Sequence, residues 1–246
     1  MWFLGHLFYP WGFVVQILVL VHFFRRRAAF YWLWIILFGG FVGAAAYILV
    51  EVLPDAGLIR LTFQSHARKN RIALVEAEIL DNPSVANLEE LGELYWDEKN
   101  YAKARDAFHR AIETRSDSPP TYYRRGVCAL EVGEAAAAVP DLEFALRSDP
   151  KMDFYRASMF LARAYAATGR DAEAATVFAE AMRHTSTPEM LYSYAAFLKS
   201  QNRREEAAEW AGRLAEKKRS APRFVQRVER PWFNKGKALL KGLSSP

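Results

Sequence analysis

A pattern of small and aromatic residues recurs through the second half of the chain with a period close to 34 residues. In one copy, Gly92 is followed by Tyr95, then by Ala104, and then by Phe108 and Ala111. Gly126 occupies the place of Gly92 in the next copy, and four copies align over residues 85–118, 119–152, 155–187 and 188–221. A unit of this length cannot bury its apolar face alone, so the pattern predicts a stack of supersecondary units.

The pattern resembles the tetratricopeptide repeat (TPR), and the resemblance covers residues 85–221. It implies that each unit is a pair of antiparallel helices. The small residues that match the positions where paired helices touch are Gly92, Gly126, Ala162 and Ala195. The fourth unit lacks the strong aromatics, as expected of a terminal unit with a wetter outer face.

Two long apolar runs precede the repeats, from about Trp2 to Phe24 and from about Ala28 to Leu53, and Arg25-Arg26-Arg27 separates them. A bilayer core needs roughly 20 apolar residues as helix, and each run reaches that length. Backbone groups in lipid must bond within their own segment, which favours helix. Because the arginines follow the first run and a second run comes directly after them, we predict a retained transmembrane hairpin rather than a cleaved signal peptide.

Two details of these runs suggest how such a hairpin packs. Gly39 and Gly43 form a GxxxG pattern, which favours close helix packing, within the hairpin first and between copies second. Gln16 is a single polar residue able to bond across the same seam.

The arginine turn and the second run resemble the two-helix segment that precedes cardiolipin-synthase-type phospholipase D enzymes. The resemblance rests on the basic turn, on the run from Trp32 to Leu37, and on Gly43 and Tyr47. It implies membrane anchoring only, because the catalytic HxK-type motifs of those enzymes are absent from the sequence. The orientation stays open, since Arg25–Arg27 and the basic residues after the second run nearly cancel.

A helical spacing of apolar residues from Ile59 to Leu80 predicts one long helix between the membrane runs and the repeats. We therefore predict an all-α chain, in which a transmembrane helical hairpin is followed by a TPR α-solenoid. Its predicted parts are a hairpin (1–55), a connecting and capping helix (56–84), four TPR units (85–221) and a basic amphipathic tail (222–246).

The first helix of each TPR pair lines a concave groove, so the resemblance implies a set of partner-binding positions. Arg, Tyr and Trp are the residue types that most often dominate binding energy. The alternative is an ordinary solvated helix face. The predicted groove residues are Glu89, Glu93, Trp96, Tyr123, Arg124, Arg156, Met159, Phe160, Arg163 and Tyr192.

The last thirty residues are strongly basic. From Glu216 onward there are nine basic and two acidic residues, with aromatic residues among them. Such a segment suits an anionic membrane surface, and it is also able to close the end of the array as a capping helix. The predicted lipid contacts are Arg227, Arg230, Trp232, Phe233, Lys235 and Lys237.

No P-loop, GxSxG, GxGxxG or metal-ligand spacing occurs in the sequence. We therefore predict no enzymatic activity, no cofactor and no metal, and we do not expect nucleic-acid binding. The predicted function is a membrane-anchored adaptor that binds a protein partner through its groove, located in a bacterial inner membrane. A fixed subunit of a larger membrane complex, or an accessory protein that senses anionic lipid, are the alternatives.

Overall fold

The computed structural model describes residues 3–26, 29–52 and 58–244, and every regular element in these ranges is a helix. The predicted start of the first apolar run (Trp2), both predicted bounds of the second (Ala28 and Leu53), Arg27 of the arginine turn and the predicted boundary at residue 55 lie outside the described residues. The chain divides into two compact units, residues 1–73 and 74–246. The all-α fold and the solenoid of helix pairs are confirmed.

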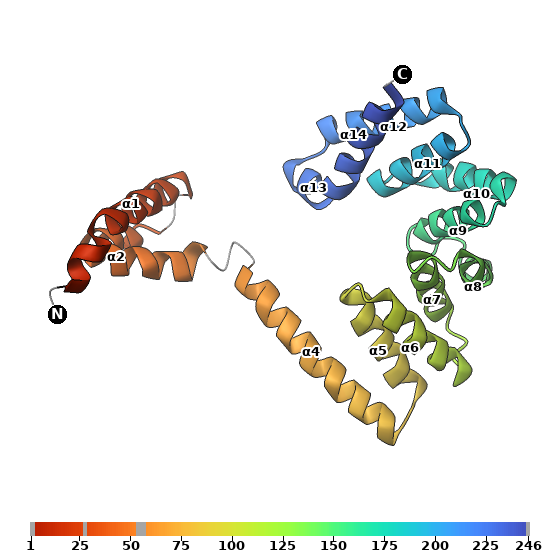
Figure 1. Cartoon of the computed structure of the whole chain (residues 1–246), viewed down its shortest axis with the longest axis horizontal. Helices are drawn as coiled ribbons and strands as arrows, with labels where there is room; N and C mark the ends of the chain where they lie inside the picture. Colours follow the sequence, from red (N-terminus) through yellow and green to blue (C-terminus); the bar gives the residue numbers. More distant parts are fainter. Residues whose placement is uncertain (1–2, 27–28, 53–57, 245–246) are drawn as a thin grey trace. The chain divides into compact units, whose positions relative to one another are not determined.

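The first unit is built on two apolar helices, α1 (Phe3–Arg26) and α2 (Tyr31–Tyr47), which pack against each other (Figure 1). A short π-helix, η1 (Ile48–Val52), continues α2. The centre of the contact is Tyr47, which is fully buried, hydrogen-bonded to His22 Nδ1 at 3.1 Å, and in edge-to-face contact with Trp32. The buried set is Val19, Phe23, Trp32, Ile36, Ala44 and Tyr47.

Helix α2 is kinked at Gly40, whose φ of 54° is left-handed. A kink of this kind interrupts the regular i to i−4 hydrogen bonding of a helix. Gln16 Nε2 donates to the Ile36 carbonyl at 2.8 Å, so the predicted bond across the seam is present. The GxxxG pattern works differently from its predicted role. A Cβ atom on Gly39 would meet nothing within 4 Å, whereas one on Gly43 would collide with the Ile35 carbonyl of its own helix.

The outer surface of this hairpin is apolar. Sixteen large hydrophobic side chains between Phe13 and Val50 are exposed, against six buried in the helix contact. Among the described residues, Tyr31–Glu51 is the one helical segment with the length and composition to cross a membrane, and Gly12–Phe24 is a shorter apolar helix.

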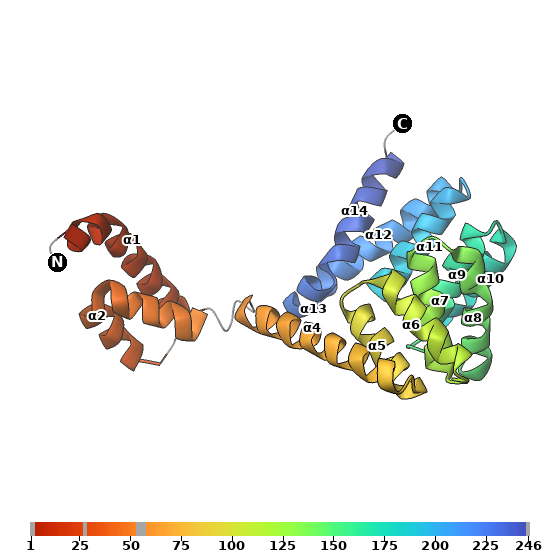
Figure 2. The same cartoon turned by 60° about the horizontal axis from the view of Figure 1, so that its bottom comes forward.

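The second unit begins in the last part of helix α4 (Leu58–Asp81), where Val75 and Ile79 are buried and Glu76 accepts a hydrogen bond from the Tyr95 hydroxyl. Four antiparallel helix pairs follow, stacked in chain order (Figures 1 and 2). They are α5 (Val85–Asp97) with α6 (Tyr101–Glu113), α7 (Pro119–Glu131) with α8 (Ala135–Ser148), α9 (Arg156–Ala167) with α10 (Asp171–His184), and α11 (Pro188–Ser200) with α12 (Arg204–Ser220).

Local sequence sets the ends of these helices. Ser84 and Thr187 cap α5 and α11 by accepting from backbone amides, at 3.2 and 3.3 Å. Within each pair the chain turns through one left-handed residue, and these are Lys99, Gly133, Gly169 and Asn202. Only two of the four turns use glycine, the residue with no steric cost in this conformation.

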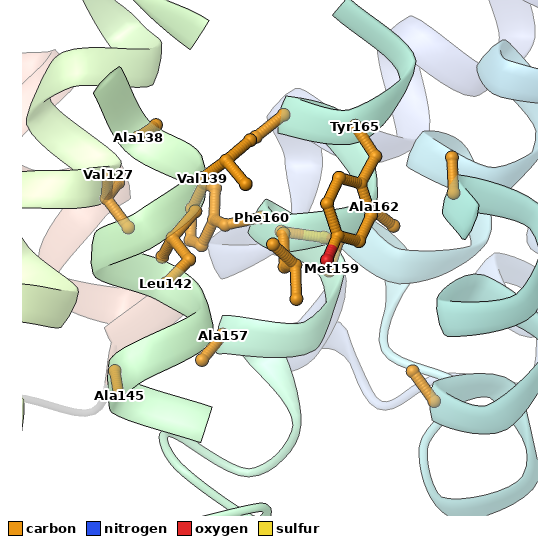
Figure 3. Close-up of a cluster of buried hydrophobic side chains, with 14 of the residues drawn as sticks. Val127, Ala138, Val139, Leu142, Ala145, Ala157, Met159, Phe160, Ala162 and Tyr165 are labelled. Carbon is orange, nitrogen blue, oxygen red and sulfur yellow. The ribbon is translucent and has the colours of Figure 1, made fainter. Parts of the chain in front are cut away.

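The small residues lie where their helices touch. A Cβ atom on Gly92 would come within 2.4 Å of Phe108 Cε1, and one on Gly126 within 2.9 Å of Leu142 Cγ. Ala162 and Ala195 are fully buried. Figure 3 shows the resulting core between the second and third pairs, where Leu142 of α8 and Phe160 of α9 lie in one apolar cluster.

Two further helices, α13 (Arg223–Val228) and α14 (Arg230–Ser244), close the array. Helix α14 packs on α11 and α12, and Phe233 is buried with Leu191 and Leu214. Gly236 permits this contact, because a Cβ atom there would lie 2.3 Å from Leu214 Cδ2. The tail is therefore a capping helix, one of the roles that the sequence suggested for it.

Candidate partner-binding groove

A groove of about 800 Å³ runs along the first helices of the repeats and ends against α14. Its walls combine aromatic rings, small residues and charges. The lining residues are Trp96, Lys99, Tyr101, Val127, Leu130, Glu131, Arg156, Phe160, Arg163, Ala166, Ala167, Phe178, Glu189, Tyr192, Ser193, Ala196, Phe197, Ser200, Pro231, Trp232 and Lys235.

Arginine side chains lie over the aromatic rings of this face. The Arg124 guanidinium is 4.3 Å from the centre of the Trp96 ring. Arg156 and Arg163 both lie over Phe160, at 5.4 and 5.2 Å. Cation–π contacts of this kind favour a guanidinium placed over the ring, so they help to position the arginines of this face.

Each of these arginines also pairs with a carboxylate about one repeat away. Glu93 of α5 accepts from Arg124 of α7 at 2.9 Å, and Glu131 of α7 accepts from Arg163 of α9 at 3.1 Å. Glu189 of α11 accepts from Arg156 of α9 at 2.7 Å. Partly exposed ion pairs contribute roughly 0.2–1 kcal/mol each. Their main effect is to brace consecutive first helices along the groove.

The structure brings five of the ten predicted groove residues into the cavity lining, and these are Trp96, Arg156, Phe160, Arg163 and Tyr192. Two more, Glu93 and Arg124, form the ion pair beside Trp96.

The other three predicted residues hold the repeats together instead. Glu89 Oε1 accepts from Ser116 Oγ at 2.6 Å and from Thr121 Oγ1 at 2.5 Å, which ties the first unit to the second. Tyr123 is buried and donates to Asp153 Oδ2 at 2.7 Å, and burial with this bond raises the pKa of its hydroxyl. Met159 is only 1% exposed.

The tail residues divide in a way that their sequence did not reveal. Trp232 and Lys235 line the groove, where Trp232 lies 5.7 Å from the Tyr192 ring and Lys235 Nζ lies 4.3 Å from the Trp232 ring. Phe233 is buried in the array, which leaves it no lipid contact to make. Arg227, Arg230 and Lys237 are exposed away from the groove.

Sequence reasoning missed several lining residues, notably Lys99, Tyr101, Glu131 and Glu189. Lys99 and Tyr101 lie at the turn between α5 and α6, beyond the first-helix positions that the resemblance carries over. Glu131 and Glu189 had a usable signal, because each lies about one repeat from the arginine it binds.

The described residues contain no group of three or more His, Cys, Asp or Glu side chains able to hold a metal ion. Cys128 is fully buried, and burial raises the pKa of its thiol to about 12. A thiol with that pKa carries almost no thiolate near neutrality.

Residues 87–118 and 123–187 each match a tetratricopeptide-repeat sequence family. The chain therefore carries tetratricopeptide repeats, and this part of it is a TPR-type protein-interaction scaffold. No curated protein sequence matches the chain. The resemblance of the N-terminal segment to cardiolipin-synthase-type enzymes finds no support in these comparisons.

Several solved structures share the fold. YrrB, a TPR protein with an unusual peptide-binding site, is 17% identical with a TM-score of 0.57, over 74% of this chain and 88% of that chain. MamA from Desulfovibrio magneticus RS-1 is 16% identical with a TM-score of 0.58, over 67% and 93%. PilW, a type IV pilus biogenesis factor, is 14% identical with a TM-score of 0.55, over 76% and 89%. At these identities the likeness shows the fold alone.

Proposed function

We propose that this protein is a membrane-anchored TPR adaptor that recruits a protein partner through the groove between its first helices and α14. The observation that carries the proposal is the groove itself. It is about 800 Å³ in volume, with aromatic rings and braced arginines on its walls. Aromatic and arginine side chains in a concave site are the usual centres of binding energy.

The test blocks the groove without disturbing the core. Ala167 and Ser200 are exposed lining residues at the ends of α9 and α11, so Ala167→Trp/Ser200→Trp should fill the cavity and leave the array folded. Ala179 and Ser148 are exposed on second helices outside the groove, and Ala179→Trp/Ser148→Trp is the matched control. Tagged full-length chains are purified from detergent-solubilised membranes, and bound proteins are identified by mass spectrometry.

We expect a partner that accompanies the wild-type chain and the control but is lost from the groove variant. A partner retained equally by all three contradicts recruitment through the groove. If that partner is also stoichiometric, the result favours the alternative of a fixed subunit held through other surfaces.

Membrane anchoring through the hairpin is the second part of the proposal. It is supported by the apolar outer surface of α1 and α2, which in water would be a large exposed patch. Phe38 and Val42 are 79% and 75% exposed. A lysine at the centre of a membrane span costs about 2.5–3.5 kcal/mol, whereas the same change on a wet surface costs little.

Phe38→Lys/Val42→Lys therefore distinguishes the two environments. We expect this variant to be released from membranes by alkaline carbonate, while the wild-type chain stays. The control is Leu80→Lys/Phe154→Lys, at two apolar residues of the array that are each 87% exposed. If the hairpin variant stays membrane-bound as firmly as the control, the proposed span is wrong. The bacterial inner membrane and the side that carries the array stay predictions.

Contact of the tail with anionic lipid stays a proposal for Arg227, Arg230 and Lys237, because Phe233 is buried and Trp232 and Lys235 line the groove. The proposal is supported by exposed apolar and basic side chains on α13 and at the start of α14. Phe224 and Val228 are exposed there, close in sequence to the exposed Arg227 and Arg230. In nanodiscs, we expect anionic lipid to slow hydrogen exchange of residues 223–244 relative to neutral lipid. Arg227→Gln/Arg230→Gln/Lys237→Gln should remove the difference. Equal exchange in both lipids for the wild-type chain would end this proposal.

A further inference from the structure

The charges that line the groove are unequal, and this bears on what occupies it. Four cationic side chains line the cavity, Lys99, Arg156, Arg163 and Lys235, against the two carboxylates of Glu131 and Glu189. Charged groups at a recognition site select partners of complementary charge. The inference drawn from this imbalance rests on the proposed function, and it concerns the chemistry of the partner.

Both carboxylates are already engaged by the array. Glu131 accepts from Arg163, and Glu189 accepts from Nε and Nη2 of Arg156 at 2.7 and 3.3 Å. A basic partner would have to displace these arginines before it found an anion.

The two lysines of the groove, Lys99 and Lys235, are not paired with an opposite charge in this way in the described part of the structure. Neither Lys99 nor Lys235 has a carboxylate oxygen within 4 Å among the described residues of the chain. Lys235 Nζ lies only over aromatic rings, 4.3 Å from the centre of Trp232 and 5.7 Å from that of Tyr192. The groove therefore holds two positive charges that the protein does not neutralise.

The positions of the lysines indicate the shape of the ligand. Lys99 lies in the turn between α5 and α6, in the first repeat, and Lys235 lies on α14, which closes the last repeat (Figure 1). Both line the same cavity, with Phe160 and the small residues Ala166 and Ala196 between them. A ligand that reaches both lysines must be elongated and must place apolar groups in the middle.

We propose that the groove binds an extended acidic segment of the partner, with carboxylates on Lys99 and Lys235 and an apolar or aromatic side chain against the partly exposed Ala166 and Ala196. Arg163 adds to this site, because it donates to Glu131 through Nη2 alone and keeps further N–H groups for a ligand. Phe160 is 3% exposed and lies beneath Arg156 and Arg163, so it supports the two arginines of this site.

The test uses dye-labelled peptides that alternate Phe with Glu, with Gln or with Lys, and reads binding to the full chain in detergent micelles by fluorescence anisotropy. Lys99→Gln/Lys235→Gln removes the two unneutralised cations. Lys151→Gln/Lys218→Gln is the matched control, because it removes the same net charge from exposed sites outside the groove. The groove block Ala167→Trp/Ser200→Trp is measured in parallel.

We expect the Glu peptide to bind the wild-type chain more tightly than the Gln peptide and the Lys peptide to bind least. Loss of two partly exposed ion pairs should raise the Kd of the Glu peptide by about two- to thirty-fold in Lys99→Gln/Lys235→Gln. The control variant should bind as wild type does, and added salt should weaken only the Glu peptide.

Two results overturn the inference, and they differ in what they say of the proposed function. If the Gln peptide binds as tightly as the Glu peptide and the groove block abolishes both, the groove binds peptide but does not select acidic ones. If the Glu peptide binds the groove block as well as it binds wild type, the acidic ligand is held elsewhere, and recruitment through the groove is contradicted together with the inference.

Discussion

Arg125 of α7 and Asp141 of α8 form a two-point ion pair inside the second repeat. Arg125 Nε donates to Oδ2 at 2.7 Å and Nη2 donates to Oδ1 at 2.6 Å. The side chain of Asp141 is only 6% exposed and that of Arg125 is 20% exposed. Removal of one partner from an ion pair that is this shielded from water lowers stability, because the remaining buried charge then has no counter-charge.

Asp141→Asn should therefore lower the free energy of unfolding by about 1–3 kcal/mol. Asp106→Asn is the control, because Asp106 also pairs with an arginine but its side chain is 66% exposed. We expect the control to change stability by less than about 0.5 kcal/mol. Urea unfolding of the full chain in micelles, followed by helical circular dichroism, measures both. Equal losses would show that burial of the Arg125–Asp141 pair adds nothing.

Two glycines should respond to alanine with opposite signs. A Cβ atom on Gly92 would lie within 2.4–2.7 Å of three atoms of the buried Phe108 ring, whereas one on Gly212 of α12 would meet nothing within 4 Å. Alanine favours a helix interior over glycine by about 1 kcal/mol. Gly212→Ala should stabilise the array by up to that amount, and Gly92→Ala should destabilise it by about 1–3 kcal/mol through overpacking.

The same urea titrations distinguish these outcomes. A Gly92→Ala chain as stable as wild type would mean that Phe108 moves aside without cost. The close contact between α5 and α6 would then not require a small residue.

Two tyrosines of first helices, Tyr95 of α5 and Tyr165 of α9, make stability sensitive to alkali. Burial and a hydrogen bond to Glu76 raise the pKa of Tyr95 to about 12, and burial and a hydrogen bond to Glu143 do the same for Tyr165. Unfolded tyrosine titrates near 10. Between pH 10 and 12 the unfolded chain therefore binds fewer protons than the folded one, and stability falls as pH rises.

Tyr95→Phe/Tyr165→Phe should make this fall shallower when the urea midpoint is measured from pH 9 to 12. Tyr155→Phe is the control, because the Tyr155 ring stacks on His184 and its hydroxyl makes no hydrogen bond within the described residues. A double variant with the same pH dependence as wild type would show that these two hydroxyls do not carry the effect.

The repeat architecture was readable from the sequence because it depends on local spacing. Gly92 and Gly126 recur at one period, and the structure places each of them against the second helix of its own pair. Contacts of this kind involve residues of a single unit, so periodicity alone identifies them.

The groove was only partly predictable, for a reason of register. Glu89, Tyr123 and Met159 occupy equivalent places in the first three units, and all three point into contacts between units rather than into the cavity. Val127 follows Tyr123 by four residues, and Arg163 follows Met159 by four. Both of these residues line the groove. In this fold, one side of a first helix packs against the neighbouring unit and another side lines the groove, and both sides carry large side chains. Helical periodicity therefore does not show which of these residues face the groove.

The sequence suggested the capping role of the tail, but it did not reveal that the tail also lines the groove. Trp232 and Lys235 reach the groove because α14 folds back on α11 and α12, and Phe233 and Gly236 fix that contact. The partners in this contact are distant in sequence and leave no periodic trace. Their basic and aromatic character is shared with membrane-surface helices, which explains why they were interpreted as lipid contacts.

Site-specific photocrosslinking in living cells tests the central claim most directly. A benzophenone side chain is placed in the groove, at Ala167 or Ser200, and outside it, at Ala179 or Ser148. Recruitment through the groove predicts a crosslink to one partner protein from Ala167 and Ser200 and none to it from Ala179 and Ser148. A partner that crosslinks only from the outer positions, or equally from all four, would contradict the account.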